Sequence, residues 1–218
     1  MKTHLVAMLV ALAMPLAGQT GSLPRLASSP EQFVPPGWTL EKKHLADLNG
    51  DGLQDALLLM KAPQTGGTPP RILAVALRRK GPATEFELAE LNEKLIPNSP
   101  DDRMEDPMAD GEITAKRGAF SVKLSLLAGA GSARTATMRY GFRYQNGCFR
   151  LIGYDRFETD RATLDTLDLS INFLTGDVVR RKGNAEANTA TKQREKLRTN
   201  PRRCFRDLNS AATFTPQI

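Results

Sequence analysis

The stretch "MRYGFRYQNGCFRLIGYDRFE", Met138–Glu158, shows the pattern that decides the fold. In its first half, polar or small residues alternate with large apolar or aromatic ones, namely Met138, Tyr140, Phe142 and Tyr144. This period of two predicts a strand with one buried face. Asn146-Gly147 follows at once, and a two-residue type I′ turn favours this pair because both central residues need positive φ. We therefore expect residues 133–145 and 148–157 to form an antiparallel hairpin.

The same period runs through most of the chain. Apolar residues alternate with polar ones over 166–174, and "LTGDV" then reverses the chain toward 178–181, which predicts a second hairpin. In total we expect ten strands: Trp38–Ala46, Ala56–Lys61, Arg71–Arg79, Glu85–Leu91, Glu112–Lys116, Ala119–Leu127, Ala133–Gln145, Cys148–Phe157, Thr166–Leu174 and Val178–Arg181. The prediction is an all-β or β-rich α+β domain over residues 38–183, an antiparallel meander of about 8–10 strands.

The N-terminus is typical of an exported protein. Residues 1–18 carry a basic start at Lys2, an apolar run over 5–16 and then small residues, the pattern of a cleaved signal peptide. A retained anchor helix is the alternative interpretation. "LAGQ" resembles the lipobox of bacterial lipoproteins, but Gln19 stands where the lipid-bearing cysteine would be. We expect a periplasmic or secreted protein, in which the Pro-rich residues 19–37 form an extended linker or edge segment.

Cys148 and Cys204 are the two cysteines of the chain. In an oxidising compartment they could form one disulfide. Two unpaired buried thiols are the alternative, and sequence alone does not decide between them because it contains no distance.

Charge is unevenly placed along the chain. The net charge is +6, and residues 175–218 hold ten Lys/Arg against four Asp/Glu, so the remainder is neutral. Residues 184–218 thus form a polar, basic C-terminal segment. Its part 184–199 has almost no apolar face and is expected to be a solvated helix or disordered, whereas 204–214 is apolar enough to dock on the body. The segment could face the acidic loop 98–112.

Left free, the basic segment could contact an acidic partner. A protein or an anionic envelope component would suit its charge. An exported chain with few aromatic residues near the charge disfavours nucleic acid as a partner.

The stretch "DLNGDGLQD", residues 47–55, is the strongest candidate for a functional site. Its closely spaced acidic residues repel one another unless something positive lies between them. Ca²⁺ prefers six to eight oxygen ligands, and alternate residues here supply them. The loop is not an EF-hand, because loop position 12 is Leu58 rather than Glu and the flanks read as strands.

The spacing resembles the calcium loop of FG-GAP/VCBS-type repeats over Leu45–Lys61. The resemblance implies Ca²⁺ ligands at five positions, namely Asp47, Asn49, Asp51, the Leu53 carbonyl and Asp55. Such repeats come in tandem, whereas this chain has one, so a complete propeller is excluded. An ion-free loop whose carboxylates accept backbone N–H bonds is the alternative.

Known catalytic motifs are missing from the sequence. The mature chain has a single histidine, His44, which excludes zinc sites built on several histidines. Acidic residues at 155, 158, 160, 165 and 168 leave a carboxylate-dependent hydrolase of an envelope polymer as an alternative. The favoured hypothesis is an exported, non-enzymatic, calcium-binding β domain that interacts with a protein or an envelope component.

Overall fold

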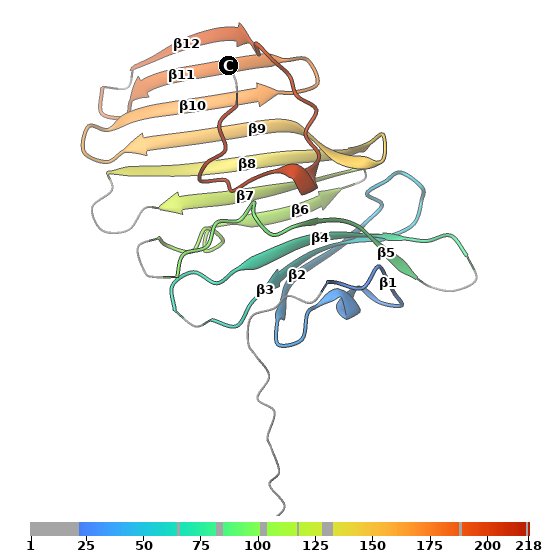
Figure 1. Ribbon diagram of the computed structural model, residues 1–218. Coiled ribbons are helices and arrows are strands. Elements are labelled where there is room, and N and C mark those ends of the chain that lie inside the picture. Colours follow the sequence, from blue (N-terminus) through green and yellow to red (C-terminus); the bar gives the residue numbers. More distant parts are fainter. Residues whose placement is uncertain are drawn as a thin grey trace, which may run out of the picture.

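The structure is a computed structural model that describes residues 22–64, 66–81, 85–100, 104–116, 118–127, 133–187, 189–216 and 218. It consists of two antiparallel sheets (Figure 1). The five-stranded sheet has the order β1 (Leu26–Ala27), β5 (Phe86–Asn92), β4 (Arg71–Arg78), β3 (Asp55–Lys61) and β2 (Thr39–Ala46). The seven-stranded sheet has the order β12 (Thr189–Lys196), β11 (Asp177–Asn184), β10 (Asp165–Asn172), β9 (Cys148–Asp160), β8 (Arg134–Gln145), β7 (Ala119–Leu127) and β6 (Glu112–Lys116).

The all-β prediction is confirmed, and each of the ten expected strands is present. Within the described residues, no helix has both the length and the apolar character needed to cross a membrane. The predicted signal peptide lies outside the described residues.

The five-stranded sheet is buried on both faces. Leu57, Leu59 and Val75 face the main core between the two sheets. Leu58 and Met60 face a second core, together with Phe33 from the short 3₁₀ helix η1 (Pro30–Phe33). Burial on both sides explains why β3 reads as a continuous apolar run rather than as an alternating one.

The seven-stranded sheet buries one face and exposes the other. Tyr140 and Phe142 of β8 are fully buried, as the alternation predicts. The predicted hairpin is confirmed: β8 pairs with β9, and the turn residues Asn146 and Gly147 have φ values of 52° and 79°. The second predicted hairpin is confirmed as well, since β10 pairs with β11.

The expectation for residues 184–199 is wrong. The segment is neither a helix nor disordered, because Thr189–Lys196 forms strand β12 and pairs along its whole length with β11. Side chains 190–196 stay exposed, so they show no apolar alternation from which a strand could be recognised. Backbone pairing stabilises β12, and its Lys and Arg residues suit an edge strand because like charges discourage pairing with another molecule.

The chain then returns to the core, as expected for 204–214. Phe205, Leu208 and Phe214 are buried, and Phe214 contacts Tyr140 and Tyr154. In Figure 1 this red segment crosses the near face of the seven-stranded sheet. Hydrophobic docking therefore closes the core on this side.

Polar groups and a disulfide hold the returning segment. Cys148 and Cys204 are bonded, with their Cα atoms 5.8 Å apart. The buried Glu90 carboxylate accepts hydrogen bonds from the backbone N–H groups of Phe149 and Arg206 at 2.6 and 3.1 Å. Burial raises the pKa of Glu90, and these hydrogen bonds oppose the rise. Of the two alternatives for Cys148 and Cys204, a disulfide or two unpaired thiols, the structure contains the disulfide.

The Pro-rich segment and the acidic loop 98–112 also differ in part from expectation. Residues 26–27 form an edge strand that pairs with β5, but Phe33 is fully buried, so the Pro-rich segment is more than a linker. In the acidic loop, Asp106 pairs with Arg71 of β4 and not with the basic segment. Residues 101–103 of this loop lie outside the described residues.

Candidate functional site

The predicted metal loop connects β2 to β3 at the junction of the two sheets. Gly50 and Gly52 have φ values of 84° and 86°, the left-handed conformation that a side chain disfavours. Leu48 is fully buried in the main core and anchors the loop. The Asp47 carbonyl accepts a hydrogen bond of 2.7 Å from the N–H of Gly118, between β6 and β7, and so ties the loop to the other sheet.

The loop side chains fold back on their own backbone. The Asp47 carboxylate accepts hydrogen bonds from the N–H groups of Gly50, Asp51 and Gly52 at 2.7, 3.1 and 3.1 Å. Asp51 accepts one from the N–H of Leu53 at 2.8 Å. Asn49 accepts one from the N–H of Asp51 at 3.0 Å and donates its amide to the Asp51 carboxylate at 3.2 Å. These bonds form the tight turn that the alternating sequence predicts.

Asp55 is the buried member of the group. Its side chain is 0 % exposed and accepts hydrogen bonds from the N–H groups of Leu48, Asn49 and Arg78 at 2.8, 3.3 and 2.9 Å. Burial raises its pKa, the backbone hydrogen bonds oppose the rise, and the nearby Asp51 charge adds to it. Asp55 therefore fastens the loop to β4 as well as to β3.

The side chains of the loop 47–55 meet some of the requirements of a metal site and not others. No group of three or more His, Cys, Asp or Glu side chains that could hold a metal occurs in the described part of the chain. Asn49 and the Leu53 carbonyl are oxygen donors of other kinds. A carboxylate has about four lone-pair positions and an amide oxygen two, so Asp47, Asn49, Asp51 and Asp55 each retain at least one. Oxygen ligands of this kind fit hard Ca²⁺.

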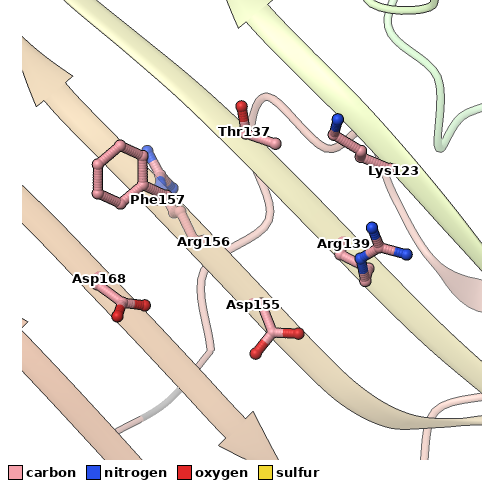
Figure 2. A pocket seen from close by; sticks show the side chains of 7 residues that line it. All are labelled: Lys123, Thr137, Arg139, Asp155, Arg156, Phe157 and Asp168. Atoms are coloured by element: carbon pink, nitrogen blue, oxygen red, sulfur yellow. The ribbon is translucent and has the colours of Figure 1, made fainter. Parts of the chain in front are cut away.

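A second polar region lies on the exposed face of the seven-stranded sheet, which we call the outer face. A cavity of about 140 Å³ there is lined by Lys123, Thr137, Arg139, Asp155, Arg156, Phe157 and Asp168. Figure 2 shows these residues on β7, β8, β9 and β10. Phe157 is 50 % exposed.

The fold brings together two of the acidic residues considered for hydrolysis and places the other three elsewhere. Asp155 and Asp168 lie on neighbouring strands of the outer face (Figure 2). Asp155 accepts a hydrogen bond of 2.7 Å from Ser170, and Asp168 is paired with Arg181 at 2.6 Å. Glu158 pairs with Arg156 and, by alternation, points to the opposite face from Asp155. The residues at 160 and 165 lie at the β9–β10 turn.

The cationic side chains of the outer face were not among the residues predicted from the sequence. Lys123 and Arg139 sit directly opposite each other on β7 and β8, and Arg139 sits opposite Asp155 on β9. The period of two, applied across the predicted hairpins, would have placed them together.

No known family model, curated protein or solved structure matches the chain.

Proposed function

We propose that this protein is an exported, non-enzymatic β domain that binds one calcium ion in the loop 47–55. One observation carries the proposal. Asp47, Asp51 and Asp55 lie within nine residues, and none forms an ion pair with a cationic side chain among the residues described. Three like charges this close destabilise the loop, and a divalent cation would offset their repulsion.

The loop geometry would limit how much has to move on binding. Its hydrogen bonds already hold the turn closed, and each of the four candidate side chains keeps an oxygen lone pair. Asp47, Asn49, Asp51, the Leu53 carbonyl and Asp55 are the proposed ligands, with water completing the six to eight oxygens that Ca²⁺ prefers.

The ion would have a structural role. The loop contacts β4 through Asp55 and the β6–β7 turn through Asp47. An ion bound to both aspartates would connect the edge of one sheet to the other. We therefore expect calcium to stabilise the folded domain.

The outer face supports a binding role for the domain as a whole. Two cross-strand rows run over β6–β12, and by register they hold five cationic side chains against three acidic ones, namely Lys123, Arg139, Arg181, Lys192 and Arg194 against Glu112, Asp155 and Asp168. The cationic side chains outnumber the acidic ones by two. A protein or envelope component with negative charge would match this surface.

Thermal unfolding with and without calcium tests the metal proposal. The dissociation constants of extracellular calcium modules are about 10⁻⁴–10⁻³ M. At about 10 mM Ca²⁺ such a site would stabilise the fold by about 1.4–2.7 kcal/mol, which raises Tm by about 3–10 °C. Mg²⁺ at the same concentration should have a smaller effect, because it dehydrates reluctantly and demands octahedral geometry.

Two variants identify the site. Asp51→Asn keeps an oxygen for the Leu53 N–H but removes a charge, so it should lose most of the calcium response. Asp110→Asn removes a charge from an exposed loop residue and should keep the response. An unchanged Tm of the wild type, or equal responses of both variants, would contradict calcium binding at 47–55 and favour the ion-free loop.

A further inference from the structure

A second, larger cavity lies at one end of the seven-stranded sheet. Its volume is about 270 Å³. Four segments meet there: the β8–β9 turn, the start of β9, the β10–β11 turn and the chain that leads from β12 to Cys204. The lining residues are Gln145, Asn146, Arg150, Leu151, Ile152, Phe173, Leu174, Asn200, Pro201 and Arg202.

Backbone pairing and a covalent bond hold these walls in place. β9 extends past the end of β10, and the returning chain takes the place of β10 there, with the N–H of Leu151 donating to the Arg203 carbonyl at 3.0 Å. The Asn200 amide donates to the Phe173 carbonyl at 2.7 Å. The disulfide between Cys148 and Cys204 closes the same corner. A cavity held in this way loses little conformational freedom when it binds a ligand.

The polar lining is cationic and lacks a counter-charge. Arg150 and Arg202 are both in the wall, and no acidic residue is. In the described parts of the chain, neither arginine forms an ion pair. The Arg150 Nε atom is buried and has no hydrogen-bond partner there. A buried guanidinium donor without an acceptor is costly, and an anion would satisfy it.

The neighbourhood of Arg150 adds to the positive potential. Arg143 of β8 lies directly opposite Arg150 of β9, and like charges in this position destabilise a sheet. The carboxamides of Gln145, Asn146 and Asn200 provide further polar groups in the wall. A bound anion would relieve the repulsion between the two arginines.

The remaining lining is apolar. Leu151, Ile152, Phe173 and Leu174 contribute to it, and Leu174 is 51 % exposed at the surface. We propose that this cavity binds a small organic oxyanion, a carboxylate or phosphate group held by Arg150 and Arg202 and attached to an apolar group that lies against Phe173 and Leu174. The proposal does not depend on calcium, because the cavity is on a different sheet from the loop 47–55.

Titration of the full chain with two probes tests this site. Phenylacetate presents a carboxylate with an apolar ring, and inorganic phosphate presents an oxyanion alone. Binding is followed by calorimetry and by backbone amide NMR shifts at a constant ionic strength of about 0.15 M, which screens exposed charges. We expect saturable binding of at least one probe, with shifts at residues 145–152 and 173–174. Tighter binding of phenylacetate would assign the site to carboxylates with an apolar group, and tighter binding of phosphate would assign it to phosphate groups.

Four variants separate a built site from general attraction to positive charge. Arg150→Gln should weaken binding at least tenfold. Arg150→Lys keeps the charge but loses the planar fork, and should weaken it at least fivefold. Arg202→Gln, at an exposed position, should also weaken binding. It tests the site if the Arg150 variants fail to fold. Lys80→Gln removes one positive charge from an exposed position after β4, outside the cavity and outside the outer face, and should leave binding within twofold.

Two results would overturn the proposal. The first is the lack of saturable binding of either probe by the wild type. The second is an equal loss for Arg202→Gln and Lys80→Gln, which would mean that net charge and not the cavity attracts the anion.

Discussion

Arg71 is the most informative side chain to remove from the body of the fold. It is 3 % exposed, and its guanidinium forms four hydrogen bonds of 2.7–3.1 Å with the carboxylates of Glu41 and Asp106. Glu41 belongs to β2, whereas Asp106 precedes β6 of the other sheet. Arg71→Met keeps most of the buried aliphatic volume and removes the charge and the hydrogen bonds.

The expected loss is about 3 kcal/mol of unfolding free energy. Removing one partner of a buried ion pair costs about 3–5 kcal/mol, because the other charge is left without compensation. The side chains of Glu41 and Asp106 are 23 % and 34 % exposed, so water can partly rehydrate them and the cost falls at the lower end. For a chain of this size, Tm should fall by about 6–12 °C.

The pH dependence of this loss has a definite sign. Partial burial disfavours the charged form of Asp106, but the hydrogen bonds and charge of Arg71 outweigh burial and lower its pKa below 3.8. A lowered pKa in the folded state stabilises the protein above the unfolded value, and the contribution disappears as the pH falls through the folded pKa. The difference between wild type and Arg71→Met should therefore be full above about pH 4 and shrink below it.

Urea unfolding followed by circular dichroism measures both effects. Arg79→Met is the matched control, because Arg79 is 50 % exposed and its ion pairs with Glu85 and Glu87 are 3.7 and 4.0 Å long. Exposed pairs contribute about 0–1 kcal/mol, so this variant should resemble the wild type. If Arg71→Met lost no more stability than Arg79→Met, the buried cluster of Arg71, Glu41 and Asp106 would not hold the two sheets together.

Two further predictions concern the hairpin and the disulfide. Gly147→Val places a β-branched residue at a φ of 79° and should cost about 1–3 kcal/mol in urea unfolding, whereas an unchanged midpoint would contradict the two-residue turn. Cys148→Ala/Cys204→Ala removes a cross-link between residues 56 apart and should cost about 4 kcal/mol; a reduced wild type that unfolds at the same urea concentration as the oxidised one would show that the bond does not stabilise the fold.

Local patterns were enough to predict most of the strands. Alternation over residues 138–144 identifies β8 because side chains on a strand point to opposite faces in turn, whatever the rest of the fold does. Asn146-Gly147 specifies its turn because few residue pairs accept two positive φ values. The spacing of Asp47, Asn49, Asp51 and Asp55 likewise predicts the tight, oxygen-rich loop, since the hydrogen bonds that close the turn span only two to seven residues.

Tertiary structure decided what depends on contacts between distant segments. β12 exists because β11 offers it a free edge, and its polar side chains carry no sign of that pairing. The bond between Cys148 and Cys204 joins residues 56 apart, and Glu90 of β5 holds the returning chain through the N–H of Arg206, which lies far away in the sequence. The cavity around Arg150 is assembled from four segments of the chain, so no local pattern contains it. The lining side chains give the cavity its chemistry, but only the packing of these segments brings Arg150 and Arg202 into one site.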